Sequence, residues 1–233
     1  VIKYLTDQGE KIDWCLVGEP TAEKRLGDVI KIGRRGSING VINIRGIQGH
    51  AAYPHNAENP IHTSSEALNE IVALQWPDKS GQFPDSILQV SNIQSGTGAH
   101  NVIPGELSLK LNVRYSPSIS SQTVIDAVEG ILRKHKLNFS ADWEDSGAPF
   151  LTTSTTLINC AIESITNVTG VNEVKQSTAG GTSDGRFIAP TGSEVVEVGP
   201  LNTSIHKVDE AVSIDELEML TEIYGKVISK LLT

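Results

Sequence analysis

The feature that most constrains the fold is the order strand, helix, strand, strand, helix, strand between residues 37 and 145. From Ser37 to Arg45 apolar and polar residues alternate strictly, which predicts a strand with one buried face. The other predicted strands of this region are Ser86–Gln94, Glu106–Tyr115 and Leu137–Trp143, and the predicted helices are Pro60–Trp76 and Gln122–His135. This order is typical of a ferredoxin-like α+β domain.

The flanking segments have a different, α/β pattern. Asp13–Gly18 and Glu194–Val198 are short apolar runs typical of buried strands, and Ser213 begins an amphipathic helix with a capping-box spacing to Glu216. Further predicted elements are strands at Val29–Gly33 and Glu173–Gln176 and a helix at Thr155–Thr169. We therefore predict an α/β domain, residues 1–36 and 149–233, interrupted by an inserted ferredoxin-like domain, residues 37–148.

Composition narrows the class of protein. The net charge of −9 argues against nucleic acid as a partner, because binding to phosphates favours basic surfaces. No apolar run approaches the roughly 20 residues of a membrane span, and no secretory signal is recognisable, so we expect a cytoplasmic protein with no membrane partner. Cys15 and Cys160 match no disulfide or zinc pattern and are interpreted as buried free thiols. Val1–Gly9 resembles the last turns of a helix and lacks an initiator Met, so we expect the later part of a longer protein.

Two polar positions after predicted strands suggest a metal site. Glu19 follows the first apolar run and precedes Pro20, which keeps it out of the helical region at the strand end. His206 lies in the polar loop Gly199–Glu210, after the later apolar strand. Taken alone, either residue is more typical of an ordinary surface loop. As a pair they suit zinc, although two protein ligands are too few for a catalytic ion.

Other polar residues suggest contacts to a substrate. His50, in the loop Gly49–His55, is interpreted as a hydrogen-bond donor to a reacting carbonyl, with a metal-ligand pair or simple loop packing as alternatives. Groups that could hold an anion are Arg34, Asn101, Arg114 and the loop Gly180–Ser183, which leads into a helical turn. Arg114 could equally be a cross-strand partner, and Gly180–Gly181 a plain turn.

Six short strings occur in order and together resemble the dinuclear-zinc aminoacylase and carboxypeptidase superfamily over essentially the whole chain. These strings are Val17–Thr21, Gly33–Ser37, Gly49–Pro54, Gly98–Pro104, Gly180–Arg186 and Asn202–His206. The resemblance implies a partial zinc-peptidase-like catalytic domain with an inserted dimerisation lid. It also implies a homodimer that hydrolyses the amide of a small N-succinyl amino acid.

The resemblance implies a role for each candidate residue. Glu19 and His206 would each bind one of two zinc ions, with cobalt as an alternative metal, and His50 would help form the oxyanion hole of the partner subunit. The residues implied to bind substrate within the subunit are Arg34, Gly181, Thr182 and Asn202, and those implied to lie near substrate, partly across the dimer, are Tyr53, Asn101 and Arg114.

The chain also departs from the superfamily pattern. An upstream His-x-Asp segment, a bridging Asp and a Glu-Glu pair supply the other ligands and the general base in that superfamily, and no such segment or pair is recognisable here. We therefore expect this chain alone to be inactive, with zinc bound incompletely or not at all. Alternatives are an acetylornithine deacetylase or related metallo-exopeptidase, and a non-catalytic dimerisation or binding module.

Overall fold

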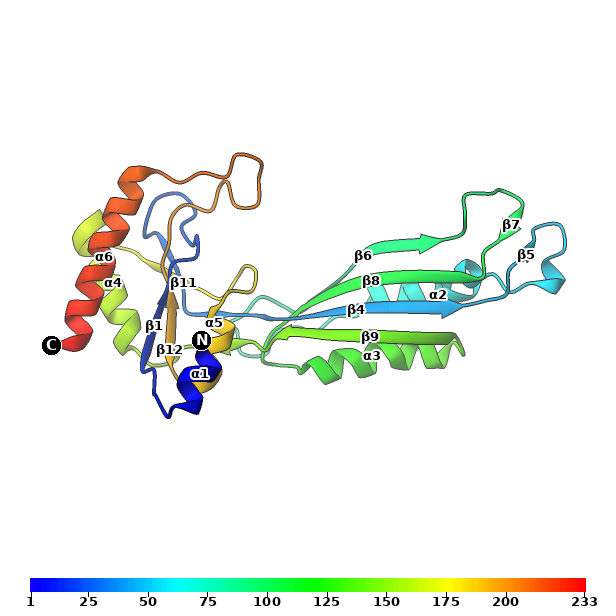
Figure 1. The fold of residues 1–233 in the computed structure, drawn as a ribbon, viewed down its shortest axis with the longest axis horizontal. Helices are drawn as coiled ribbons and strands as arrows, with labels where there is room; N and C mark the ends of the chain where they lie inside the picture. Colours follow the sequence, from blue (N-terminus) through cyan, green and yellow to red (C-terminus); the bar gives the residue numbers. More distant parts are fainter. The chain divides into compact units, whose positions relative to one another are not determined.

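The computed structural model describes residues 1–233, which divide into two compact units (Figure 1). Unit 1 comprises Val1–Arg35 and Pro149–Thr233, and unit 2 comprises Gly36–Ala148. These limits lie next to the predicted domain boundaries. Each unit has its own cluster of buried apolar side chains, so each is described by itself. None of the helices combines the length and the apolar character that a membrane span requires.

Unit 1 is built on a four-stranded mixed sheet in the order β1-β12-β2-β11. The strands are β1 (Trp14–Val17), β2 (Val29–Lys31), β11 (Lys175–Ser177) and β12 (Glu194–Glu197). β1 runs parallel to β12 and β2 parallel to β11, whereas β12 and β2 are antiparallel. A separate two-stranded ladder joins β3 (Gly33–Arg34) to β10 (Phe150–Leu151). The helical elements are α1 (Ile2–Asp7), α4 (Thr156–Thr169), α5 (Gly185–Ile188), η2 (Ala189–Thr191) and α6 (Ile214–Leu232).

The core of unit 1 lies between the sheet and helices α4 and α6. Ile165 and Ile223 are fully buried there against Ile30 and Val196. Each such side chain contributes about 1.5–3 kcal/mol by leaving water. The predicted amphipathic character of α6 agrees with its buried residues, Leu220, Ile223 and Val227.

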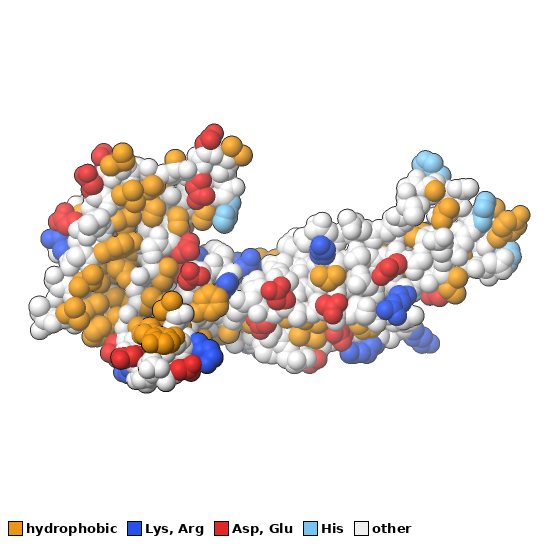
Figure 2. Space-filling view, in the orientation of Figure 1, with side chains coloured by type: hydrophobic (Ala, Val, Ile, Leu, Met, Phe, Trp, Pro, Cys, Tyr) orange, Lys and Arg blue, Asp and Glu red, His pale blue; other side chains and the backbone are white.

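β1 differs from its prediction as a buried strand. It is the edge strand of the sheet: Trp14 is 36% exposed and the three residues after it are only half-buried. Beside it lies an apolar groove of about 360 Å³, lined by Leu16, Tyr224 and Ile228 among others. Figure 2 shows hydrophobic side chains gathered on this face of unit 1.

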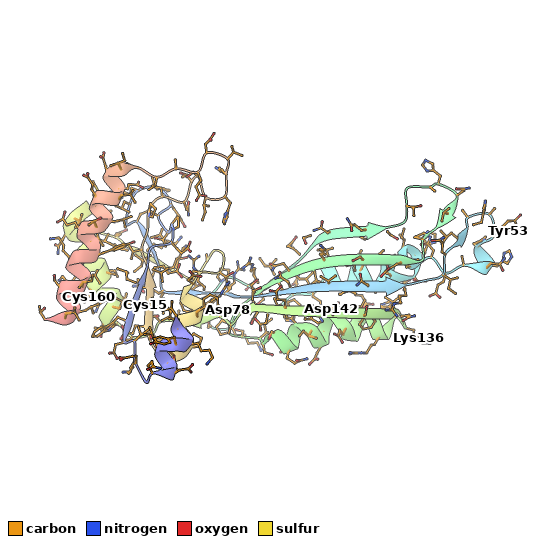
Figure 3. The ribbon with its side chains drawn as sticks, viewed as in Figure 1. Cys15, Tyr53, Asp78, Lys136, Asp142 and Cys160 are labelled. Carbon is orange, nitrogen blue, oxygen red and sulfur yellow. The ribbon has the colours of Figure 1, made fainter.

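Two smaller predictions for unit 1 are wrong. Ser213 precedes α6 but makes no side-chain cap, and the Glu216 carboxylate accepts a hydrogen bond from the Leu201 N–H (3.3 Å) instead of completing a capping box. This contact ties the start of α6 to the loop after β12. Cys15 and Cys160 are free thiols as predicted, but both are half-buried rather than buried (Figure 3).

Unit 2 has the predicted ferredoxin-like architecture. Its four strands are antiparallel in the order β6-β8-β4-β9, with two helices. The elements are β4 (Gly36–Arg45), α2 (Pro60–Val72), β6 (Ile87–Ser95), β8 (Glu106–Tyr115), α3 (Ser121–Lys134) and β9 (Asn138–Gly147). Ile38, Ile42 and Ile44 are at most 1% exposed, so the alternation of β4 marks its core face correctly.

The tip of unit 2 holds structure in two separate segments that the sequence analysis left as loops. β5 (Gly49–His50) pairs with β7 (Val102–Ile103), and a 3-10 turn, η1 (Pro54–Asn56), follows β5. The loops before α2 and before β8 are therefore joined. The predicted helix Pro60–Trp76 also ends early, at Val72, and Trp76 instead bridges to Ser86.

Candidate active site

The backbone segments that carry Glu19 and His206 leave the same edge of the unit 1 sheet. Val17 and Glu197 are paired at the ends of the parallel strands β1 and β12. Beyond them, the Gly199 N–H donates to Thr21 Oγ1 (3.0 Å), and the Asn202 N–H donates to the Ala22 carbonyl (2.9 Å). The two loops are therefore hydrogen-bonded to one another just after the sheet ends.

Gly199 permits this close approach. A Cβ at this position would lie 2.0 Å from the Glu19 carbonyl oxygen, which no side chain could accommodate without moving backbone. Glu19 itself is half-buried and belongs to no helix or strand.

His206 is exposed at the far part of the second loop and has a left-handed backbone (φ 59°). Turns shape the segment around it: Lys207 N–H donates to the Ser204 carbonyl (3.0 Å), and Ser204 Oγ donates to the Ala211 carbonyl (2.7 Å). Asn202, the predicted substrate contact, begins this segment, and its own N–H makes the hydrogen bond to the Ala22 carbonyl.

The donor types of Glu19 and His206 suit zinc, but their number does not complete a site. A catalytic zinc takes three protein ligands and leaves a position open. The chain gathers no group of three or more His, Cys, Asp or Glu side chains that could hold a metal ion. The zinc roles of Glu19 and His206 therefore stay predictions that need ligands beyond these two.

Arg34 lies beside this edge in a buried ion pair that the sequence analysis missed. Its guanidinium donates through Nε (2.9 Å) and Nη2 to Glu197 Oε2, while Ser183 Oγ donates to Glu197 Oε1. Glu197 is fully buried and Arg34 is 6% exposed. A buried carboxylate is stable only when its acceptors are satisfied, and here three donors satisfy them.

The Gly180–Ser183 loop folds over Arg34. Arg34 Nη1 donates to the Ala179 carbonyl (3.3 Å), and a Cβ on Gly180 (φ 111°) would lie 2.5 Å from that nitrogen. Gly181 is exposed and Thr182 half-buried. The helix after this loop, α5, is a single turn. Its dipole is therefore too small for the anion-binding helix N-terminus that the sequence suggested. Arg34 thus uses the guanidinium N–H groups that were predicted to bind substrate to position this loop instead. Its role in binding substrate stays a prediction.

A second buried cation lies close to Glu197. Lys31 is 5% exposed, pairs with Glu197 across β2 and β12, and donates to Ser177 Oγ (3.3 Å). Burial, reinforced by the Arg34 charge, lowers the pKa of Lys31. Burial and the charge of Glu197 also raise the pKa of the Cys15 thiol. A charged residue inside the apolar string Val195–Val198 was the signal that could have revealed Glu197.

The remaining predicted residues lie in unit 2 and fall into two places. His50, Tyr53 and Asn101 are together at the tip: Ala51 N–H donates to the Asn101 carbonyl (2.9 Å), and the His50 and Tyr53 rings are 5.7 Å apart (Figure 3). Arg114 lies near the other end of β8, about 25 Å along the strand from its first residue. Its Nε donates to Asn112 Oδ1 (3.0 Å) on the same strand, so this contact does not test the predicted cross-strand role.

Comparison with known proteins identifies a similar domain and similar folds. Residues 32–140 match the peptidase dimerisation domain of the M20 group. The fold is similar to a tripeptidase from Staphylococcus aureus (TM-score 0.79, 20% identity, 97% of this chain and 59% of the other). It is also similar to an M20 family metallo-carboxypeptidase from Sulfolobus solfataricus (TM-score 0.78, 16% identity, 97% and 66%). The chain therefore has an M20 peptidase fold that includes the M20 dimerisation domain.

Sequence comparison with curated proteins gives a more specific similarity than the fold does. The chain is 51% identical over 232 residues to a succinyl-diaminopimelate desuccinylase of Thioalkalivibrio sulfidiphilus and 50% identical over 233 residues to that of Nitrosococcus oceani. All of this chain is covered, but it spans only 61% and 62% of the length of those relatives. Along its whole length the chain is therefore similar to one part of these succinyl-diaminopimelate desuccinylases.

Proposed function

We propose that the chain is part of a zinc-dependent amidohydrolase that converts N-succinyl-LL-2,6-diaminopimelate to succinate and LL-2,6-diaminopimelate. The observation that carries this proposal is the sequence identity of 50–51% to desuccinylases along the entire chain. The convergence of the Glu19 and His206 loops at one sheet edge supports it. The reaction would serve cytoplasmic synthesis of lysine and cell-wall precursors.

In this proposal each candidate residue of the chain has one task. Glu19 and His206 bind one zinc ion each, and zinc, when bound, supplies a Lewis acid that polarises the amide carbonyl and activates water. His50 donates a hydrogen bond to the developing oxyanion in the partner subunit's site, where such a donor is typically worth ~100–1000-fold in rate. Gly181, Thr182 and Asn202 bind the substrate, and Arg34 holds the loop that carries Gly181 and Thr182 in place.

The chain alone supplies no general base in this scheme, so we expect it to be inactive. The test is a chimera in which this chain replaces the matching part of the Thioalkalivibrio sulfidiphilus relative. The chimera should release succinate from N-succinyl-diaminopimelate, and its Glu19→Gln and His206→Gln variants should lose both activity and bound zinc. Turnover by the chain alone, or a preference of the chimera for N-acetylornithine or a dipeptide, would contradict the proposal.

The match of residues 32–140 to a dimerisation domain favours a second function, self-association of unit 2 without metal. β6 is an edge strand with no charged residue, and Ile87 and Ile93 are about half exposed on it. The opposite edge, β9, carries acidic side chains, including Asp142 and Glu144. Uncharged edges are the ones that pair with other chains, so we propose that β6 forms the homodimer contact. Light scattering with zinc and with a chelator should give the same dimer mass.

A further inference from the structure

The His50 side chain closes a turn in the tip loop of unit 2. Tyr53 N–H donates to the His50 carbonyl (2.8 Å), and Ala52 N–H donates to the ring nitrogen Nδ1 of His50 (3.0 Å). The imidazole nitrogen thus occupies the place that an Asp or Asn oxygen takes when its side chain bonds the backbone two residues on. The contact is local and does not depend on how the two units are placed.

This hydrogen bond fixes where the proton of a neutral imidazole must be. One ring nitrogen of neutral histidine is a donor and the other an acceptor. Because the Ala52 N–H points at Nδ1, that nitrogen must present its lone pair, and the proton must be on Nε2. We infer that the Ala52 amide holds His50 as the Nε2–H tautomer, so that its neutral side chain can donate a hydrogen bond but offers no free lone pair.

The surroundings leave Nε2 available for another molecule. The ring is exposed and lies 5.7 Å from the Tyr53 ring, and no residue of the chain accepts a hydrogen bond from Nε2. The pairing of His50 with Val102 in β5 and β7 holds the backbone of the turn. The available group is therefore a fixed donor, which suits a carbonyl or oxyanion. It suits neither a zinc ion nor proton abstraction, both of which require a lone pair, so the alternative of a metal-ligand pair with His55 is disfavoured.

The tautomer of His50 is inferred from the hydrogen bond within the turn alone. Its use at an oxyanion rests on the proposed function. The two inferences are therefore tested separately. The first test is a two-bond ¹⁵N–¹H correlation spectrum of the histidine-labelled chain at about pH 9, where imidazoles are neutral. His62, an exposed residue of α2 whose ring makes no hydrogen bond, is the internal control. The variants His50→Asn and His62→Asn assign the signals.

His50 should show one protonated nitrogen, Nε2, and one bare nitrogen, Nδ1, while the His62 signals should be averaged between tautomers. Addition of zinc should leave the His50 nitrogens unshifted. Averaged His50 signals, a proton on Nδ1, or a zinc-induced shift of either nitrogen would overturn the inference.

The second test measures kcat/KM of the chimera. His50→Asn keeps an acceptor for the Ala52 N–H but cannot reach the position of Nε2, so a loss of ~100–1000-fold is expected. His50→Gln places an amide N–H near that position and should lose distinctly less. If the spectrum shows the Nε2–H tautomer but His50→Asn keeps full activity, the tautomer holds and the proposed role at the oxyanion fails.

Discussion

Removal of the Glu197 carboxylate should destabilise unit 1 severely. In Glu197→Ala the Arg34 guanidinium would remain buried without its partner, and Ser183 would lose its acceptor. Breaking a buried ion pair by deleting one member costs about 3–5 kcal/mol. With a urea dependence of about 2 kcal/mol per M, the unfolding midpoint of unit 1 should fall by about 2 M.

Hydrogen exchange at increasing urea separates the two units, because peptides from β12 and α6 report on unit 1 and peptides from β4 and β8 on unit 2. Only the first set should lose protection. The matched control replaces both charges of the pair, Arg34→Met with Glu197→Leu, and should lose much less stability because Arg34 is no longer buried without its partner, while the buried Lys31 is present in both variants. A loss below about 1 kcal/mol in Glu197→Ala, or equal losses in the single and double variants, would refute this account.

Three further predictions follow from single contacts. Hydrogen bonds from Ser80, Ser118 and Phe83 lower the pKa of Asp78 (Figure 3), so its stabilising effect is complete above about pH 4 and is lost as pH falls through the folded-state pKa. Thermal melts from pH 7 to pH 2 should show a weaker acid dependence in Asp78→Asn, and identical slopes would contradict this. Ile93→Lys, on the uncharged edge β6, should shift the dimer to monomer in light scattering, whereas loss of the dimer in Val72→Lys instead would place the contact on α2. Gly199→Ala should destabilise unit 1 by about 1–3 kcal/mol through its clash with the Glu19 carbonyl. Gly225→Ala, in α6 with open space around it, should instead gain up to about 1 kcal/mol in urea unfolding, and equal effects of the two changes would rule out the clash.

Elements with a long, regular pattern were predictable from the sequence. The alternation from Ser37 to Arg45 and the amphipathic pattern of α6 each report a single buried face, and the structure has those faces in the two cores. β1 was harder, because a short apolar run has the same pattern in the centre and at the edge of a sheet. The pairing of β5 with β7 could not be predicted, because each strand is too short to have a period.

The position of a candidate site residue was predictable where it depends only on the direction of the preceding strand. Glu19 and the loop of His206 both follow strand ends, and parallel strands bring such ends to one edge. The ion pair between Arg34 and Glu197 was not predictable, because the two residues are far apart in sequence. A single arginine in a sequence also gives no signal of whether it will bind another protein side chain or a ligand. The tautomer of His50 depends on one amide direction, which only coordinates reveal.

The ladder between β3 and β10 gives the chain a modular character. Arg34 pairs with Phe150, so the polypeptide departs from unit 1 and returns to it on neighbouring strands, while Ser37 and Gly147 pair at the base of unit 2. A cassette of residues 36–148 can therefore be excised and its flanks rejoined by a short hairpin turn, without stretching the remaining backbone. The same geometry lets a different inserted domain be grafted at a junction that is already closed.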